Sequence, residues 1–416
     1  MSGSDCDVAV VGGGAAGLGA ALAAAQAGAR TLLVEEGPAL GGNATAAFVH
    51  TLCGVYRTDT DAPEPANPGL ALRFAEGLVA AGGASPPERV GRVWVVPTEP
   101  PAIEGHALGL CREAGVDLRM GCALTAIRLG PGDAPHRLVL EGATGRSEVL
   151  AQLVVDASGD GALAGLGAVE AERAGAQERQ LPSYIVRLAG VPAEDVAGYG
   201  RLRLAVAVAG AVRQQALPEG CESVLLRPAA KPGEAYLTFN VSRADATAAP
   251  DRAALEQTAR AHVEAVVAFL RATRPGYAEC RVESWPRRLG VREGARLAGL
   301  ARVDHADLLA GRRRDDEVAV STWPIELWHD HRRALFRYPE AASSIPLGAL
   351  VSRSHGRVGM AGRCLSASHE ALGALRVLGT ALATGEAIGL AAALAASSGR
   401  SLADVTAAEV RRARRS

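Results

Sequence analysis

Short apolar runs and glycine-rich turns alternate over the first part of the chain. Residues 8–11 are continuously apolar, which is typical of a central parallel strand that is covered on both faces. Small residues then continue to Ala27 and predict a helix that packs closely on the sheet, with Gly28 as its stop signal. Residues 31–34 predict a second strand. The chain therefore opens with a strand, a tight turn, a helix and another strand.

Periodicity predicts further elements along the rest of the chain. Helical spacing of apolar residues predicts helices over residues 102–114, 251–272 and 376–397. Strand-like segments are expected around residues 124–129, 137–140 and 149–155. The middle of the chain, from about Ala164 to Pro339, is less regular and looks like a separate domain.

Length and charge limit the classes of protein that fit. With 416 residues, the chain is long enough for two or three domains and a large buried core. Hydrophobic residues make up 48% and charged residues 21%, the balance of an ordinary globular protein. A formal net charge of -1 gives no electrostatic footprint for nucleic acid or an anionic membrane, and we expect neither as a partner.

Lysine and cysteine usage excludes several kinds of site. Lys231 is the only lysine, so the sequence holds no phosphate-binding loop of the Gly-Lys-Ser/Thr type. The seven cysteines have no C-x-x-C spacing, so neither a zinc ribbon nor a dithiol redox pair is expected. Their scatter fits reduced thiols in a reducing cytoplasm. The Ala-, Gly- and Arg-rich composition suggests a bacterial genome rich in GC.

Targeting and membrane signals are weak. The N-terminus carries Asp5 and Asp7 and no basic segment, so it does not read as a signal peptide. Residues 387–396 form an apolar stretch that is too short to span a bilayer, and they predict a buried helix. We therefore expect a cytoplasmic protein.

The turn after the first strand matches a dinucleotide fingerprint. Gly12 allows the tight turn, Gly14 lets the backbone approach a pyrophosphate, and Gly17 lets helix and strand pack closely. The helix N-terminus offers free N–H groups and the positive end of its dipole to the phosphates. Glu35 lies 35 − 12 = 23 positions after Gly12, close to the roughly 20 expected of the acid that binds the ribose.

Further segments resemble one family of flavoproteins. Residues 36–45 resemble the second signature of the glutathione-reductase-like superfamily, in which a Gly-Gly turn after the strand-end acid leads the chain toward the flavin. Residues 361–377 are similar to the C-terminal flavin-contact segment of the FAD-dependent oxidoreductase family, which is related to fumarate-reductase-type flavoproteins and thiazole synthase. Residues 155–161 resemble the strand-end motif of that family, and segments within 269–293 resemble its substrate domain.

The resemblance implies a non-covalently bound FAD and an α/β fold. It implies a doubly wound, Rossmann-like FAD-binding domain made of residues 1–165 and 340–416, with an inserted α+β substrate domain over residues 166–339. The residues expected to bind FAD are Gly12, Gly14, Ala15, Ala16, Gly17, Glu35, Glu36, Gly41, Gly42, Asn43, Thr45, Leu124, Ala157, Ser158, Gly159, Gly362, Arg363, Arg376 and Val377.

The chain departs from the family pattern at one place. Relatives tend to carry a Ser/Thr-Arg pair after the Arg292-Glu293 dipeptide, whereas this chain has Gly294 and Ala295, with Arg296 following. The identity of the substrate therefore cannot be carried over from the family.

Candidate groups for redox and proton chemistry follow from the same segments. A helix that starts at Arg376 would stabilise the negative charge that a reduced flavin develops around N1 and the C2 carbonyl. His50 and His369 are candidate bases, because their segments pass the flavin in the resembling family, although each also fits a structural role. Cys53 is a third candidate, with a packed thiol as the plainer interpretation. His329-Asp330-His331 lacks a third ligand at a recognisable spacing, so no metal is expected.

These features predict an FAD-dependent oxidoreductase that moves two electrons, as hydride through flavin N5, to or from a small organic molecule. Oxygen or an electron-carrier protein is the expected second partner. A dehydrogenase or oxidase is favoured, because no second dinucleotide-binding unit occurs between Ala164 and Pro339. A flavin monooxygenase and a non-catalytic flavin-binding subunit for electron relay are the alternatives.

Overall fold

The larger lobe of the protein is built on a seven-stranded sheet. In the computed structural model, which describes residues 5–175, 177–241, 249–330 and 334–415, the strand order is β6-β2-β1-β9-β8-β7, with β20 also paired to β9. β1, β2, β6, β9 and β20 run parallel, and β7 and β8 are antiparallel additions. The bounds are β1 Cys6–Val11, β2 Thr31–Glu35, β6 Asp117–Met120, β7 Cys122–Arg128, β8 His136–Gly142, β9 Gly145–Asp156 and β20 Val358–Met360. The strands expected from the sequence are therefore confirmed, in a mixed sheet assembled from both ends of the chain.

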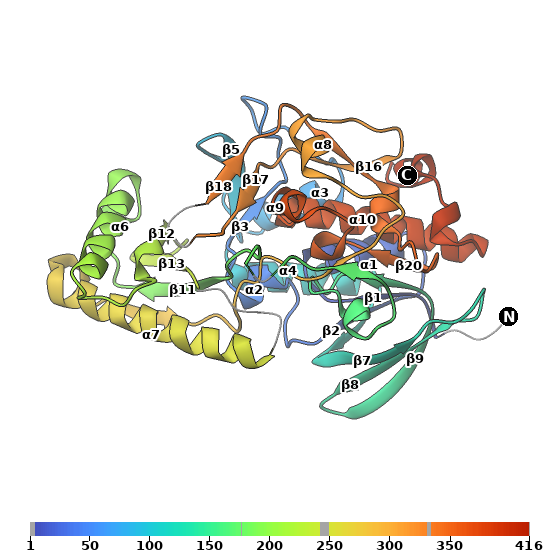
Figure 1. Ribbon diagram of the computed structural model, residues 1–416, viewed down its shortest axis with the longest axis horizontal. Helices are drawn as coiled ribbons and strands as arrows, with labels where there is room; N and C mark the ends of the chain where they lie inside the picture. The colour runs from blue at the N-terminus through green and yellow to red at the C-terminus, as the bar shows by residue number, and fades with distance from the viewer. Residues whose placement is uncertain (1–4, 176, 242–248, 331–333, 416) are drawn as a thin grey trace.

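Two helices from opposite ends of the chain pack against each other beside this sheet. α1 (Ala15–Gln26) and α10 (Leu378–Ser398) cross at a close backbone contact (Figure 1). A Cβ atom at Gly385 would lie 2.0 Å from the carbonyl oxygen of Ala16, so this approach requires glycine. Within the described residues, α10 is the one helix long and apolar enough to cross a membrane, and 89% of its apolar window is buried in the protein. The buried helix expected near the C-terminus is confirmed.

The C-terminal helix differs from the sequence prediction at its start. Instead of one helix over 376–397, the structure has α9 (His369–Leu375) and α10, with Arg376 and Val377 between them. Val377 has an extended backbone (φ -68°, ψ 150°) and forms the N-cap of α10. The helical spacing of apolar residues continues through this break, so the pattern could not reveal it.

Helices and a small sheet complete the larger lobe. The helix predicted over 102–114 is confirmed as α4, which begins at Pro100 because proline is tolerated in a first helical turn. A three-stranded antiparallel sheet in the order β3-β5-β4 and the helix α3 were not predicted. The bounds are α2 Asn43–Ala46, β3 Thr51–Cys53, α3 Leu70–Ala80, β4 Glu88–Val90, β5 Val93–Pro97 and α4 Pro100–Glu113.

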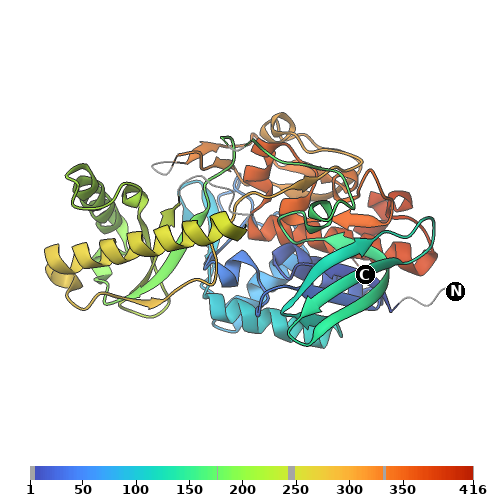
Figure 2. The same ribbon diagram turned by 60° about the horizontal axis from the view of Figure 1, so that its bottom comes forward.

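The smaller lobe, residues 183–284, has a sheet and a core of its own. Figures 1 and 2 show it extending from the larger lobe, with α6 and the long α7 against an antiparallel sheet in the order β12-β13-β11-β14. Tyr184, Phe239 and Val263 are among the buried residues that join sheet and helices. The bounds are β11 Ser183–Ala189, α6 Gly198–Arg213, β12 Leu225–Pro228, β13 Glu234–Asn240, α7 Ala249–Thr273 and β14 Arg281–Ser284. α7 is the helix predicted over 251–272.

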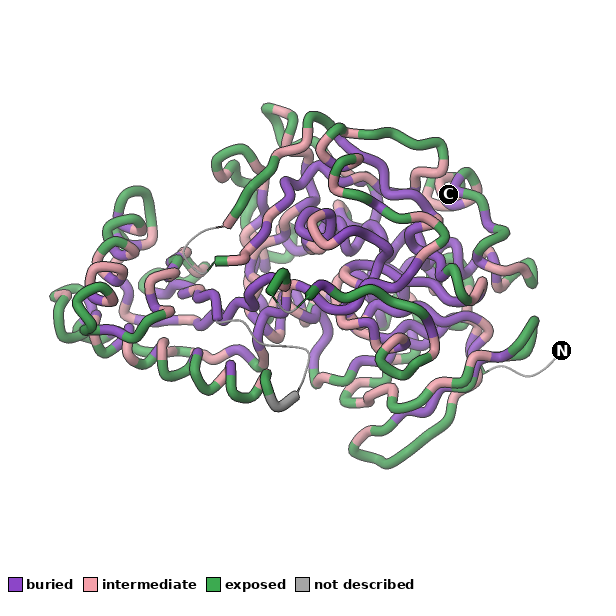
Figure 3. Tube along the Cα trace, viewed as in Figure 1, coloured by how far each residue is buried: buried purple, intermediate pink, exposed green. Residues whose placement is uncertain are grey.

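The segment after the smaller lobe returns to the larger one. Val303 and Ile325 belong to the same buried cluster as Val8 of the central sheet, although the sequence assigned them to the substrate domain. Figure 3 shows this buried region at the centre of the larger lobe. The division at residue 339 stays a prediction. The bounds are α5 Ala162–Gly165, β10 Ala171–Glu172, β15 Arg296–Leu297, α8 His305–Leu309, β16 Glu317–Ser321, β17 Ile325–Leu327, β18 Leu335–Arg337, β19 Ser343–Pro346 and α11 Ala407–Ala413.

Candidate active site

A cleft of about 1000 Å³ lies where the parallel strands of the central sheet end. Val11 at the end of β1, Val34 in β2 and Ala157 after β9 line it, together with Ala15 and Leu378, the first residues of α1 and α10. The carboxyl ends of parallel strands are the usual ligand-binding edge of such sheets. Two helix N-termini also face the cleft, so it favours a ligand that carries negative charge.

The glycine-rich turn shows which glycines the fold itself requires. A Cβ atom at Gly12 would lie 2.6 Å from Ser158 Cα, and one at Gly17 would lie 1.7 Å from the Gly12 carbonyl oxygen. Gly14 is different, because it has φ -73° and its Cβ would meet only Gly42 Cα, at 3.8 Å. Gly14 also lines the cleft. Packing alone leaves room for a side chain there, so this glycine fits a ligand that approaches the backbone closely.

Glu35 holds the turn together at the edge of the cleft. The side chain accepts hydrogen bonds from the Gly13 N–H at 2.7 Å and from the Gly37 N–H at 2.8 Å, one on each carboxylate oxygen. Glu35 is only 7% exposed and lines the cleft. A carboxylate can accept about four hydrogen bonds, so Glu35 keeps acceptor positions for ribose hydroxyls.

We expect Glu35→Ala to weaken FAD binding much more than Glu36→Ala. Hydrogen bonds to charged groups contribute about 1.5–3 kcal/mol, so the Kd for FAD should rise roughly tenfold to a hundredfold. The Glu36 side chain is 63% exposed, and its contact is an ion pair with Arg288 at 3.6 Å. Titrating each apoprotein with FAD measures the two constants, and a parallel melting curve separates binding from folding. Equal losses for the two variants would contradict the role of Glu35.

The opposite wall of the cleft follows β9. Asp156 is fully buried and accepts hydrogen bonds from the Ser158 hydroxyl at 2.6 Å and from the Leu163 N–H at 2.9 Å. Burial raises the pKa of Asp156. Arg363 reaches across the wall to Asp160 at 3.2 Å and lines the cleft beside it. This network fixes the loop after β9 at the position that the sequence motif at 155–161 predicts.

Arg288 is a cleft residue that the sequence did not single out. It follows the smaller lobe, and its backbone N–H donates to the Ala46 carbonyl at 3.1 Å, which holds the segment over the cleft. Its Nε is buried and has no hydrogen-bond partner among the described residues. A guanidinium in this position fits the phosphates of a dinucleotide.

We expect Arg288→Met to raise the Kd for FAD about tenfold, the effect of one lost charge-assisted hydrogen bond. The neighbouring Arg287→Met is the matched control, because Arg287 pairs with Glu104 at 3.3 Å and does not line the cleft. Fluorescence titration of FAD into each apoprotein measures both constants. A Kd for Arg288→Met that equals the value for Arg287→Met would rule out the phosphate contact.

Most of the residues that the sequence assigned to FAD lie around this one cleft. Its lining includes Gly12, Gly14, Ala15, Ala16, Glu35, Glu36, Gly42, Asn43, Leu124, Ala157, Ser158, Gly159, Gly362, Arg363 and Arg376. Residues that the sequence did not assign also line it, among them Cys122, Ala123, Asp160, Ala162, Arg288, Leu378 and Ala381. Asp160 was within reach of sequence reasoning, because it belongs to the motif at 155–161.

Four assigned residues lie behind the cleft lining. Gly17 packs on the Gly12 carbonyl, and a Cβ at Gly41 would meet Thr45. The Thr45 hydroxyl donates to the Leu40 carbonyl at 2.7 Å, so its hydrogen bond serves the turn. Val377 packs in a small apolar cluster with other buried side chains. These residues shape the cleft from behind, and direct contact with FAD stays a prediction for them.

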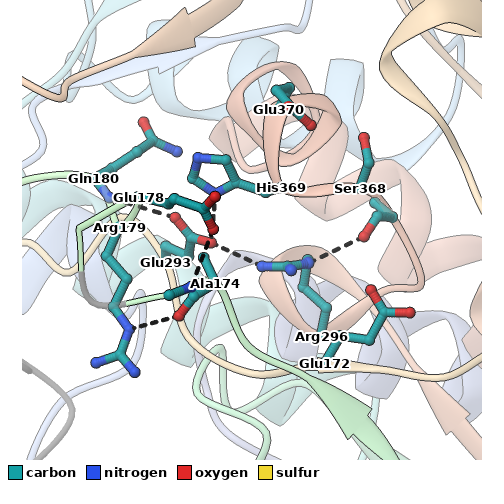
Figure 4. Close-up of polar contacts among 12 residues, drawn as sticks. Glu172, Ala174, Glu178, Arg179, Gln180, Glu293, Arg296, Ser368, His369 and Glu370 are labelled. Carbon is teal, nitrogen blue, oxygen red and sulfur yellow. Dashed lines mark hydrogen bonds and ion pairs between the residues drawn. The ribbon is translucent and has the colours of Figure 1, made fainter.

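The partly buried His369 pairs with the buried Glu293, which Figure 4 shows in detail. The His369 Nδ1 and Glu293 Oε1 atoms are 2.8 Å apart, and Arg296 Nη1 donates to the same oxygen at 2.8 Å. Because a carboxylate only accepts hydrogen bonds, Nδ1 carries a proton in this contact, and in the neutral ring the lone pair is then on Nε2. Nε2 is buried and has no partner among the described residues. The backbone N–H of Gln180 also approaches Glu293, at 3.4 Å.

The other two candidates for proton chemistry have less suitable surroundings. His50 lines a second cavity, of about 1090 Å³, between the two lobes, and it does not line the cleft at the strand ends. Its ring stacks on Tyr236 with centroids 4.2 Å apart, and burial lowers the pKa of His50 to about 4. Burial raises the pKa of the Cys53 thiol to about 12, so it is protonated at neutral pH. Catalytic roles for all three residues stay predictions.

The sequence predicts no metal site, and the structure describes only part of the His329-Asp330-His331 segment. Among the described residues, no group of three or more His, Cys, Asp or Glu side chains could hold a metal ion. His331 of the His329-Asp330-His331 segment lies outside them.

The parallel sheet, the glycine-rich turn, the strand-end acid and the helix N-termini at one cleft define a dinucleotide-binding protein of the flavoprotein type. A family model for FAD-dependent oxidoreductases matches residues 7–413, so the chain belongs to this family and its cofactor is FAD. The open space at Gly14 and the unpaired Nε of Arg288 fit that cofactor.

Two solved structures, each with a TM-score of 0.51, show the same fold at low sequence identity. A geranylgeranyl bacteriochlorophyll reductase-like protein from Thermoplasma acidophilum is similar over 99% of this chain and 82% of its own, with a TM-score of 0.51 and 14% identity. BexE, studied for oxidation during BE-7585A biosynthesis, is similar over 95% of this chain and 63% of its own, with a TM-score of 0.51 and 17% identity. Aklavinone-11 hydroxylase, solved with FAD and aklavinone, has a TM-score of 0.46 and 16% identity, over 95% of this chain and 63% of its own. No match was found among curated proteins.

Proposed function

We propose that this FAD-dependent oxidoreductase acts as a dehydrogenase or oxidase on a small organic molecule. The observation that carries the proposal is the His369–Glu293 pair, which leaves His369 Nε2 as an unpartnered proton acceptor. A base of this kind suits the removal of a proton from a substrate that is being oxidised. We also propose that the family belongs to the glutathione-reductase-like superfamily and that the protein is cytoplasmic.

The pair connects to the cleft through Gln180. The Gln180 backbone contacts Glu293, and its side-chain oxygen accepts a hydrogen bond at 3.4 Å from Arg376, which lines the cleft. In Figure 4 the Gln180 amide lies on the side of the His369 ring away from Glu293. A substrate held near Gln180 would therefore have the base on one side and the cofactor cleft on the other.

The reaction balances with these groups. FAD, when bound, would supply the two-electron acceptor for a hydride from the substrate. His369 Nε2 takes the proton that leaves with it, and Glu293 and Arg296 hold the ring in the orientation that this requires. A single bond of the substrate becomes a double bond. The two electrons then pass to oxygen or to an electron-carrier protein.

Anaerobic titration with small alcohols, amines and acids tests this function. We expect one class to bleach the flavin absorption, with one oxidised product molecule formed for each FAD. A protein that holds FAD but is reduced by no organic compound would contradict the proposal and favour an electron-relay subunit. We expect FAD to be bound non-covalently, so denaturation of the protein should release it.

A further inference from the structure

Arg292 and Arg376 lie near each other, close enough for the charge of Arg376 to lower the pKa of Arg292. Both donate hydrogen bonds to the segments 180–181 and 326–328 or stack on them. Arg292 donates to the Leu181 carbonyl, and its guanidinium lies 4.9 Å from the centre of the Trp328 ring. Arg376 donates to the Gln180 side-chain oxygen at 3.4 Å and to the Glu326 carbonyl at 3.3 Å. The two segments are themselves joined, because the Leu181 N–H donates to the Trp328 carbonyl at 2.8 Å. The two positive charges are thus held in fixed positions near each other.

The surroundings balance the positive charge of this pair only in part. Glu326 lies close enough for its negative charge to raise the pKa of both arginines against the lowering by burial, and its Oε1 accepts a hydrogen bond from the Trp328 indole at 2.5 Å. Among the described residues, no ion pair joins a carboxylate to Arg292 or Arg376. Burial, and then the charge of Arg376, lowers the pKa of Arg292 to about 9. Two partly buried positive charges share one nearby carboxylate, Glu326, so the arrangement favours an additional anion.

Two hydrogen-bond donors at the same place also lack acceptors. The Arg376 Nε and the Gln180 Nε2 are both buried and have no partner among the described residues. Gln180 is only 5% exposed. A ligand that only accepts hydrogen bonds, such as a carboxylate, would satisfy both donors and balance the charge together.

We infer that Arg292, Arg376 and Gln180 bind a carboxylate group of the substrate. The inference rests on the proposed function, because it treats the ligand as the molecule that is oxidised. Arg376 lines the cofactor cleft and Arg292 does not, so a group on Arg292 belongs to a ligand other than FAD. Gln180 and Glu293 connect this carboxylate site to His369, so the oxidised bond lies next to the anchored end of the substrate.

Binding of small carboxylates to the FAD-loaded protein tests this site. Acetate, succinate and benzoate are titrated at constant ionic strength, with acetamide and benzamide as uncharged controls of similar shape. Tryptophan fluorescence is the readout, because Trp328 lies against Arg292, and flavin absorbance is recorded with it. We expect a saturable signal from at least one carboxylate and none from the amides. No saturable response to any of the three carboxylates, or an equal response to the amides, would overturn the inference.

Variants identify the arginine that binds. Arg292→Met should weaken carboxylate binding roughly tenfold to a hundredfold, the effect of losing hydrogen bonds between charged groups. Arg260→Met is the control, because Arg260 lies 4.7 Å from the Trp285 ring in a similar stacked contact but is exposed on α7. Unchanged carboxylate binding in Arg292→Met would overturn the inference, and so would loss of FAD from it. A different result would contradict the proposed function, namely that no organic compound bleaches the flavin.

Discussion

Replacing His369 by asparagine should slow the reduction of bound FAD by its organic substrate by about 10²–10⁴-fold, the usual effect of removing a general base. We expect this loss because His369 Nε2 has no hydrogen-bond partner among the described residues and is available to accept a proton. The Glu293 carboxylate orients the ring by its contact with Nδ1. Stopped-flow mixing without oxygen measures the rate. The FAD content should stay unchanged, because His369 does not line the cofactor cleft.

His50→Asn is the matched control for this variant. His50, like His369, has a buried Nε2 without a partner among the described residues, but burial lowers the pKa of His50 to about 4, which makes it a weak base at neutral pH. We expect its substitution to change the reduction rate far less than that of His369. A larger loss of reduction rate in His50→Asn than in the His369 variant would identify His50, which lines the cavity between the lobes, as the base.

Substituting valine for Gly14 should abolish tight FAD binding without unfolding the protein. The apoprotein has room at this position, since a Cβ would meet only Gly42 Cα at 3.8 Å, and the added side chain would project into the cleft. We expect the Kd for FAD to rise at least about a hundredfold, because the pyrophosphate can no longer approach the turn. The melting temperature of the apoprotein should change little.

Gly17→Val separates the role of the ligand from that of packing. A Cβ at Gly17 would lie 1.7 Å from the Gly12 carbonyl oxygen, so α1 would have to move away from the turn. This variant should melt at a lower temperature even without FAD. If Gly14→Val destabilised the apoprotein as much as Gly17→Val, the argument that Gly14 serves the cofactor would be wrong.

The cofactor cleft could be predicted from the sequence because its main parts are local motifs. Gly12, Gly17 and Glu35 act within one strand–turn–helix–strand unit, in which spacing along the chain determines spacing in the fold. The break before α10 was missed, since Val377 is apolar and continues the helical pattern while its backbone is extended. A hydrophobic pattern records burial and does not record such a change of backbone conformation.

The residues around the substrate come together across long stretches of chain, which limits what the sequence can predict. Glu293 and His369 are 76 positions apart, and the contact between Gln180 and Arg376 spans 196. Arg288 reaches the cleft because the chain returns from the smaller lobe over Ala46. These contacts depend on how the second lobe docks, and no periodicity or spacing in the sequence specifies that docking.

The source of the electrons is the most direct test of this account. The FAD-loaded protein is mixed in a stopped-flow instrument, without oxygen, with NADH, with NADPH and with the carboxylate-bearing compound that bleaches it in titration, each alone and in combination. The account predicts that the organic compound alone removes the visible flavin absorption, and that neither nicotinamide cofactor does so or accelerates the change. Rapid bleaching by NADH or NADPH, with or without the organic compound, would contradict it and would favour a flavin monooxygenase.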